Sequence, residues 1–288
     1  MKRILITGAN SYIGTSFENY MAQFGSDYQI DTVDMRGDSW REKDFSGYDS
    51  LIHVAGIVHV KEKNDQLYYQ VNRDLAVETA KKAKKDGVKQ FIFFSSMSIY
   101  GMDTGVITKE TKPNPKNAYG KSKLAAEELL RELQADDFQI CVLRPPMIYG
   151  PNSVGNYPRL AKLAKKTPIF PKVNNQRSML YIGNLSAFLK LMIDTTLSGT
   201  FHPQNKEYVN TSEMVKLIAK TNRKKLYLVP GFSGIITVFS SQVSTLRKVF
   251  GTLVYDDKTQ GFPGSTCNNK LMTYQNKNFD DSILETEL

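Results

Sequence analysis

A buried strand that runs directly into a glycine turn constrains this chain more than any other stretch. Residues 3–7 form a short apolar run that is typical of a buried parallel strand. The turn that follows spans residues 8–14, and apolar residues then recur at helical spacing up to Gly25. A strand, a glycine turn and a helix in this order predict an α/β fold with a doubly wound parallel sheet.

The same turn is the first candidate binding site. Glycines let backbone amides approach a pyrophosphate, and the N-terminus of the following helix favours negative charge. Ser11 replaces the middle glycine of the usual three, which weakens the motif when it is taken alone. The residues that we expect to contact a dinucleotide here are Gly8, Asn10, Ser11, Tyr12, Ile13 and Gly14.

A second predicted strand, over residues 28–34, ends on a carboxylate. Asp34 lies 20 residues after Gly14, where an acid can accept hydrogen bonds from an adenosine ribose. It favours NAD, because a carboxylate repels the 2′-phosphate of NADP. Arg36 could accommodate that phosphate, so NADP is the alternative cofactor. A purely structural aspartate at a strand end is the alternative to any cofactor contact.

Two further apolar runs extend the predicted sheet, over residues 51–56 and 88–94. The first ends in small residues that would let a cofactor lie close to the backbone. Its expected cofactor contacts are His53, Val54 and Ala55. We expect His53 to be hydrogen-bonded beneath the cofactor and not to bind a metal, since no carboxylate or cysteine spacing supports a metal site. The second run delivers Ser95 and Ser96 to the sheet edge where open parallel sheets bind ligands.

Tyr119 and Lys123 lie four residues apart in what we expect to be the first turns of a helix. Both side chains therefore leave the same helix face. A phenol titrates near 10 in a model peptide, which is too high for a general base at neutral pH. A neighbouring cation favours the phenolate and would lower this pKa toward the working range. The alternative is an exposed Tyr and Lys on an ordinary amphipathic helix, because the pattern is short.

Several stretches together resemble a known family. They are Thr7-Gly8-Ala9, Ile13-Gly14, Asp34, His53-Val54-Ala55, Asn72, residues 95–101, residues 119–123 and residues 143–151. Over roughly residues 1–185 the chain resembles extended short-chain dehydrogenase/reductases of the nucleotide-sugar epimerase and dehydratase group, such as UDP-glucose 4-epimerase. The resemblance implies an NAD-binding Rossmann domain over residues 1–150, to which later segments return. It also implies a smaller C-terminal α/β lobe over residues 151–288, which would bind the nucleotide sugar.

The resemblance also implies roles for individual residues. The family's catalytic positions are occupied by Ser96, Tyr119 and Lys123. Of these, Tyr119 and Lys123 would also contact the cofactor and Ser96 the substrate, and Asn72 matches an asparagine near the active site. Asn156 resembles an asparagine that meets the nucleotide diphosphate. Arg177 resembles an arginine whose fork suits a phosphate, with a surface arginine at a strand edge as the alternative.

The two residues after Ser96 distinguish reactions within the family. Sugar 4,6-dehydratases carry Asp-Glu at these positions, whereas Met97 and Ser98 cannot transfer those protons. We therefore expect an NAD-dependent 4-epimerase that acts on a UDP-hexose or UDP-N-acetylhexosamine in surface polysaccharide assembly. The alternatives are an NAD(P)H-dependent 4-keto-sugar reductase and a non-catalytic dinucleotide-sensing protein. Asn184, where the family often has Asp, and the Pro-Pro-Met after Arg144 leave the sugar open.

The composition bears on partners and compartment. The net charge of +9 suits an anionic ligand, but lysines spread over helical faces without aromatic interleaving indicate solvated surfaces and no nucleic-acid partner. The two cysteines, Cys141 and Cys267, fit a reducing compartment without disulfides. With no evident secretory signal and no apolar run that could span a bilayer, we expect a cytoplasmic protein without an integral membrane segment. A homodimer is a possible assembly.

Beyond residue 200 the patterns become weaker. We expect a helix that runs to about Lys220, with Thr211 as its N-cap. The apolar stretch over residues 232–250 predicts a packed lid, with contact to a membrane surface as the alternative. The tail after Gly251 shows little periodicity and predicts partial disorder.

Overall fold

A computed structural model describes residues 1–58, 64–231, 244–256 and 274–288 of the chain. Cys267 and most of the apolar stretch over residues 232–250 lie outside these ranges. A six-stranded sheet has the order β10-β6-β4-β3-β1-β2, and every pair in it is parallel. Its strands are β1 (Lys2–Thr7), β2 (Tyr28–Val33), β3 (Ser50–His53), β4 (Gln90–Phe94), β6 (Gln139–Leu143) and β10 (Gly199–Phe201).

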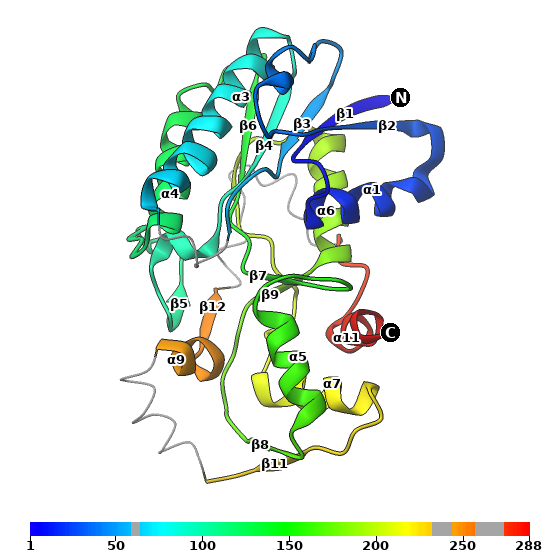
Figure 1. The fold of residues 1–288 in the computed structure, drawn as a ribbon, viewed down its shortest axis with the longest axis vertical. Helices are drawn as coiled ribbons and strands as arrows, with labels where there is room; N and C mark the ends of the chain where they lie inside the picture. The colour runs from blue at the N-terminus through cyan, green and yellow to red at the C-terminus, as the bar shows by residue number, and fades with distance from the viewer. Residues whose placement is uncertain (59–63, 232–243, 257–273) are drawn as a thin grey trace.

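Helices cover both faces of this sheet (Figure 1), which confirms the predicted doubly wound α/β fold. One face carries α1 (Tyr12–Met21) and α6 (Ile182–Thr195), and the other carries α3 (Leu75–Lys85) and α4 (Ala118–Arg131). Along β1, Ile4 and Ile6 pack with the first pair of helices and Leu5 with the second. A strand buried on both faces reads as a continuous apolar run, which is why the sequence pattern revealed these strands.

The order of the strands reverses beside β1. The chain passes from β1 to the edge strand β2 and then returns to the other side of β1 to form β3. Thr7 and His53 are register partners at the carboxyl ends of β1 and β3. Open α/β sheets bind ligands in the crevice at such a reversal, so the fold places the ligand site here.

The smaller lobe lies at the lower end of the molecule in Figure 1. Its helices are α5 (Asn156–Lys166), α7 (Thr211–Thr221), α9 (Ser244–Phe250) and α11 (Phe279–Glu287), and α7 packs against both α5 and α11. Its parallel strand pairs are β7 (Met147–Tyr149) with β9 (Met179–Tyr181), β8 (Ile169–Pro171) with β11 (Tyr227–Val229), and β5 (Gly105–Ile107) with β12 (Leu253–Tyr255).

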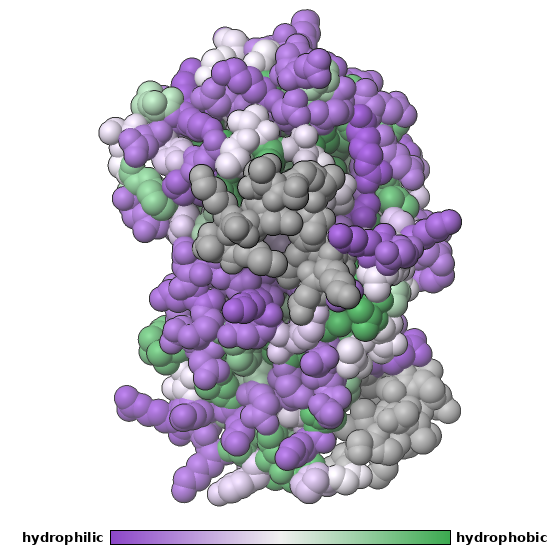
Figure 2. Space-filling view, turned by 180° about the vertical axis from the view of Figure 1, so that it is seen from behind, coloured by the Kyte–Doolittle hydropathy of each residue, from purple (hydrophilic) through white to green (hydrophobic). Residues whose placement is uncertain are grey.

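The remaining elements are short. They are η1 (Ala22–Asp27), η2 (Ser39–Arg41), α2 (Asp65–Tyr68), η3 (Tyr69–Asp74) and η4 (Met97–Tyr100). No helix in the described part of the chain is long and apolar enough to cross a bilayer. From behind, hydrophilic residues cover most of the visible surface and hydrophobic residues form small patches between them (Figure 2).

Three features of the C-terminal half refine the sequence expectations. Asn210, and not Thr211, is the N-cap of α7, because the Asn210 side chain accepts from the amides of Ser212 and Glu213. The tail forms both β12 and α11, and a hydrogen bond of 2.6 Å joins Tyr149 Oη to Ser282 Oγ of α11. β10 pairs with β6 in the large sheet, and the division of the chain at residue 150 stays a prediction.

Candidate active site

The turn after β1 has the backbone that close contact with a ligand requires. Gly8 has a φ of 117°, and a Cβ placed on it would lie 2.9 Å from the amide nitrogen of Ala55. Only glycine fits this position without strain. Asn10 also has a positive φ, of 59°. The backbone of β1 therefore comes close to the chain after β3 at the point where the strand order reverses.

Ser11 caps helix α1. Its Oγ accepts a hydrogen bond of 3.1 Å from the amide of Gly14, so the serine that replaces the usual glycine serves as the N-cap. The first amides of a helix have no acceptor within it, and here these belong to Tyr12 and Ile13. This helix end is suited to an anion such as a pyrophosphate.

Asp34 follows β2 and is bound by Arg36. The Arg36 Nε lies 3.0 Å from both carboxylate oxygens, and Nη2 lies 2.5 Å from Oδ2. This hydrogen bonding lowers the pKa of Asp34 to about 2. Arg36 thus offsets the carboxylate charge that would repel a 2′-phosphate, and the pair is compatible with both NAD and NADP.

His53 is the last residue of β3 and is buried. Its Nδ1 lies 2.8 Å from the Thr7 hydroxyl, which confirms the expected hydrogen-bonded histidine. The ring stacks with those of Phe91 and Phe93. Burial and the charge of Lys123 lower the pKa of His53 to about 3, so the imidazole is neutral. Its position beneath a cofactor stays a prediction.

Asn72 lies in η3, a π-helical segment between α2 and α3. Its Oδ1 accepts from the Ile57 amide at 2.8 Å, and its Nδ2 donates to the Ile57 carbonyl at 3.1 Å and to Ser122 Oγ at 3.2 Å. The wider turns of η3 interrupt the α-helical stretch between α2 and α3 at Asn72. Such turns often mark functional positions, and this one lets Asn72 join the loop after β3 to α4.

Tyr119 and Lys123 lie on the first turns of α4, and Ser96 precedes η4. The two elements touch closely, because a Cβ on Gly120 would lie 2.9 Å from the carbonyl oxygen of Ser98. Ser96 is thereby near enough to Tyr119 to influence the pKa of its phenol, while Ser96 Oγ accepts hydrogen bonds from the amide and the hydroxyl of Ser98. The structure therefore places Ser96, Tyr119 and Lys123 on neighbouring elements, and their catalytic roles stay a prediction.

Desolvation is the largest influence on both titratable groups of this trio. Burial raises the pKa of Tyr119, and the nearby Ser96 hydroxyl lowers it only in part. Burial lowers the pKa of Lys123 to about 7, against the attraction of Glu127. The Lys123 ammonium lies 4.7 Å from the centre of the Phe93 ring. The expectation that Lys123 lowers the pKa of Tyr119 is wrong for this structure, because Lys123 is not among the groups that shift it.

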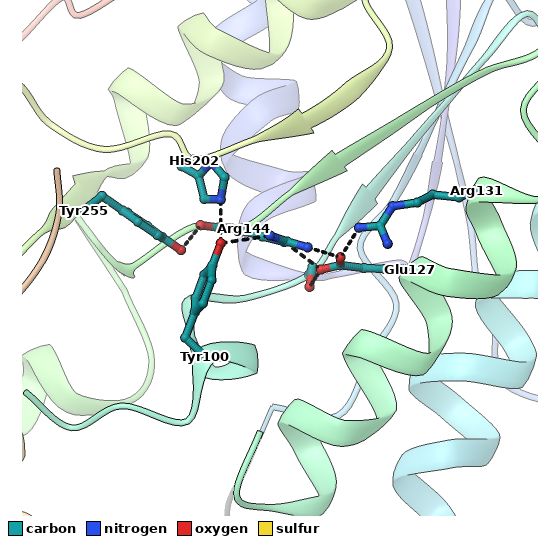
Figure 3. Close-up of polar contacts among 7 residues, drawn as sticks. Tyr100, Glu127, Arg131, Arg144, His202 and Tyr255 are labelled. Atoms are coloured by element: carbon teal, nitrogen blue, oxygen red, sulfur yellow. Dashed lines mark hydrogen bonds and ion pairs between the residues drawn. The ribbon is translucent and has the colours of Figure 1, made fainter. Parts of the chain in front are cut away.

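A buried network of ion pairs and hydrogen bonds beside α4 was not predicted from the sequence. Glu127, one turn beyond Lys123, is fully buried and accepts from Arg144 Nε at 3.0 Å and Arg144 Nη2 at 2.6 Å. Arg131 Nη2 donates to it at 2.7 Å (Figure 3). The Ser95 hydroxyl donates to it as well. The sequence held one weak signal for this network: Glu127 lies four residues after Lys123 and therefore on the same helix face.

The network continues from Arg144 into the smaller lobe. Arg144 Nη1 donates to Tyr100 Oη at 2.8 Å, and Tyr100 Oη lies 2.8 Å from His202 Nε2. The Tyr255 hydroxyl donates to the Arg144 carbonyl at 2.8 Å (Figure 3). Burial lowers the pKa of His202 to about 3, so this histidine is also neutral. The helix that carries Tyr119 and Lys123 is thereby tied to β6, η4 and β12.

The residues expected to bind the nucleotide sugar lie in the smaller lobe. Asn156 is exposed at the start of α5. Arg177 is half-buried and forms an isolated β-bridge with Leu253, and its Nη1 donates to the Gly251 carbonyl at 2.9 Å. Asn184 is fully buried and donates to Asn205 Oδ1 and to a tail carbonyl, so it serves a packing role. Among the described interactions, none joins Asn156 or Arg177 directly to the Ser96–Tyr119 pair.

The residues at the carboxyl ends of β1, β2 and β3 fit a dinucleotide. The close backbone at Gly8 and the N-terminus of α1 suit the pyrophosphate of such a ligand, and the carboxylate of Asp34 suits its adenosine ribose. Tyr12 Oη and His53 Nε2 are buried polar atoms that have no hydrogen-bond partner among the described residues. Within the described ranges, no group of three His, Cys, Asp or Glu side chains is placed to hold a metal.

Comparison with known proteins gives a consistent result. A sequence model of the NAD dependent epimerase/dehydratase family matches residues 4–201. The N-acetyl-alpha-D-glucosaminyl-diphospho-ditrans,octacis-undecaprenol 4-epimerase of Escherichia coli O157:H7 is 27% identical over 242 residues, which cover 77% of this chain and 73% of that protein. The UDP-glucose 4-epimerase of Vibrio cholerae is 28% identical over 258 residues, which cover 80% of this chain and 78% of the relative.

A reductase and a solved structure are also similar to this chain. The GDP-6-deoxy-D-mannose reductase of Pseudomonas aeruginosa is 24% identical over 257 residues, which cover 79% of this chain and 83% of that protein. The crystal structure of a UDP-glucuronic acid 4-epimerase from Bacillus cereus in complex with NAD superposes with a TM-score of 0.73 at 18% identity. That match covers 99% of this chain and 97% of the other, and it shows that the two share a fold.

Proposed function

Because this chain belongs to the NAD-dependent epimerase/dehydratase family, we propose that it is an NAD-dependent nucleotide-sugar 4-epimerase that serves surface polysaccharide assembly. One observation carries the proposal: Ser96, at the start of η4, and Tyr119 and Lys123, on the first turns of α4, lie on closely packed elements at the carboxyl edge of the sheet. A serine and a tyrosine on such neighbouring elements can act on one substrate oxygen, one as hydrogen-bond donor and the other as proton acceptor. Met97 and Ser98 add no second acid or base for an elimination.

In the proposed reaction, Tyr119 takes the proton of the C4 hydroxyl while Ser96 donates a hydrogen bond to the same oxygen. When bound, NAD would accept the hydride from C4 and return it to the opposite face of the keto sugar. Lys123, one helical turn beyond Tyr119 on the same helix face, would contact the bound cofactor. Gly8, the α1 N-terminus and Asp34 would hold the cofactor.

The smaller lobe would hold a UDP-hexose or a UDP-N-acetylhexosamine. In this proposal Asn156 and Arg177 meet the diphosphate. One N–H group of Arg177 donates to the Gly251 carbonyl and so holds the guanidinium in position. The other N–H groups would donate to the diphosphate. A lipid-linked sugar diphosphate is a further substrate to test, since the name of the Escherichia coli relative specifies one.

A 4-keto-sugar reductase is the second candidate. It uses the same Ser96, Tyr119 and Lys123 but only the return half of the reaction, with external NAD(P)H consumed. Two observations favour it: Arg36 offsets the charge of Asp34, and a GDP-6-deoxy-D-mannose reductase is among the relatives. The two candidates differ in whether the chain needs added reduced cofactor.

The purified protein should be incubated without added cofactor with UDP-galactose, UDP-N-acetylgalactosamine, their glucose counterparts and N-acetylglucosaminyl-diphospho-undecaprenol. Formation of the C4 isomer of any of them, resolved by chromatography, is the expected result. The Tyr119→Phe variant, which keeps the ring but not the proton acceptor, is the control and should lose most turnover while it retains nucleotide binding. If no isomer forms and a 4-keto sugar oxidises NAD(P)H instead, the reductase replaces the epimerase.

A further inference from the structure

The net positive charge of the chain is concentrated in one stretch. Residues 151–231 contain 13 of the 38 Lys and Arg residues but only 3 of the 29 Asp and Glu residues. In the remainder of the chain, 25 basic residues face 26 acidic ones, so the charges nearly cancel. Lysines scattered only for solubility would not produce this division. A positive electrostatic field that is concentrated in one part of the molecule is suited to an anionic partner.

Much of this charge lies at one end of the smaller lobe. Helices α5 and α7 pack side by side there, and β8 and β11, which follow them, form a parallel pair at the lower end of Figure 1. The exposed basic residues are Lys162, Lys165, Lys166, Lys172, Lys216, Lys220, Arg223, Lys224 and Lys225. We call these residues, together with β8 and β11, the basic tip. Only Lys165 of this set has a recorded ion pair among the described residues, with Glu287 at 2.7 Å.

The basic tip also exposes apolar side chains where its strands pair. Ile169 is 56% exposed and Tyr227 is 63% exposed, and the two are register partners in the parallel pair. Register partners point to the same face of a sheet, so an aliphatic and an aromatic side chain lie next to each other. The next residue of β8, Phe170, points to the core and is 3% exposed.

Leu163 on α5, 45% exposed, adds a third apolar side chain to the basic tip. Hydrophobic atoms appear between hydrophilic ones over the lower end of the molecule in Figure 2. Single exposed apolar residues are ordinary, but an apolar pair surrounded by lysines is the composition of surfaces that lie in the headgroup region of a bilayer. The lysine stems can lie along the apolar residues while their ammonium groups reach lipid phosphates.

We propose that the basic tip docks on an anionic membrane surface, with Ile169 and Tyr227 entering the headgroup region. Anionic lipids attract Lys and Arg near the surface, and apolar insertion adds a contribution that salt does not screen. A nucleic acid would use the charge but would leave the apolar pair unexplained. The docking surface is separate from Ser96 and Tyr119 and does not depend on the proposed reaction.

Co-sedimentation of the full chain with vesicles tests this proposal. The protein should bind vesicles of phosphatidylcholine mixed with phosphatidylglycerol, and bind phosphatidylcholine alone much less. Lys162→Gln/Lys166→Gln should weaken binding about 25-fold, because each lysine near an anionic surface contributes about fivefold in affinity. Ile169→Ser/Tyr227→Ser should also weaken binding and leave the residual part more sensitive to salt.

A matched control lies on the other lobe. Helix α3 has 11 residues, as does α5, and its exposed Lys81 and Lys85 have the same spacing as the two test lysines. Lys81→Gln/Lys85→Gln should bind as the wild type does, and circular dichroism should show that every variant is folded. The proposal is overturned if mixed vesicles bind no protein, if the tip and control variants bind equally, or if the tip binds polyuridylate but not vesicles.

Discussion

Lys123 should make the protein less stable than it would be with an apolar residue in the same place. The side chain is 4% exposed, and burial lowers its pKa from 10.5 to about 7. Folding at neutral pH must therefore either bury a charge or release a proton, and both cost free energy. Lys123→Met keeps the unbranched stem and removes the ammonium group, so it removes this cost.

The magnitude and its pH dependence follow from the two pKa values. Each pKa unit corresponds to about 1.36 kcal/mol, so the fall from 10.5 to about 7 amounts to about 5 kcal/mol at low pH. At pH 7, where Lys123 of the folded protein is about half protonated, the cost is about 4 kcal/mol. Between these two values the unfolded state binds more protons than the folded state, so wild-type stability rises with pH across this window. The advantage of Lys123→Met is therefore largest at or below pH 7 and declines toward zero near pH 10.5.

Urea unfolding of both proteins, stripped of bound nucleotide, across this pH window measures the effect. Lys121→Met is the control, because Lys121 is exposed on the same helix and its replacement should change the free energy of unfolding by less than about 0.5 kcal/mol. If Lys123→Met is less stable than the wild type at pH 7, or if its gain does not change with pH, the burial argument fails. A gain in stability with loss of turnover would mark Lys123 as a residue retained for function.

Three further changes test other parts of the site. Glu127→Ala leaves the Arg144 side chain, 10% exposed, without its carboxylate and should lower the free energy of unfolding by about 3–5 kcal/mol in urea. Glu127→Leu combined with Arg144→Met should cost less than Glu127→Ala, and purely additive costs would contradict the pairing. Arg36→Ala should return the pKa of Asp34 toward 3.8 and increase the preference for NAD over NADP in binding titrations, whereas an unchanged ratio would show that the pair does not set cofactor choice. Gly8→Ala forces a Cβ to within 2.9 Å of the Ala55 amide and should weaken nucleotide binding and cost about 1–3 kcal/mol of stability, so wild-type values of both would exclude the close approach.

The parts of the fold that local patterns encode were predicted from the sequence. The strands of the large sheet are buried on both faces, so each one appears as an apolar run that stands out from its flanking turns. The turn after β1 has a positive φ at Gly8, and glycine is the residue type that adopts such a φ readily, so the turn could be predicted from the sequence. Tyr119 and Lys123 follow from helix periodicity, and Ser96 from its place after a strand.

Long-range pairings could not be predicted in the same way. Residues 105–107 pair with residues 253–255, and nothing in either three-residue segment identifies its partner. Glu127 has the spacing of an ordinary surface helix residue, and only the position of Arg144 after β6 makes it a buried ion pair. The prediction that Lys123 lowers the pKa of Tyr119 was wrong for a related reason. Desolvation dominates this pKa, and it depends on the whole fold and not on the residue four positions away.

The most direct test of the proposed epimerisation follows the hydrogen at C4. The purified protein, without added cofactor, should be given the accepted UDP-sugar carrying deuterium at C4, and the C4 isomer examined by mass spectrometry and NMR. The account predicts that the isomer retains the deuterium at C4, because the hydride that leaves with the help of Tyr119 returns to the same carbon. Loss of the deuterium to solvent, or product formation only with added NAD(P)H, would contradict it.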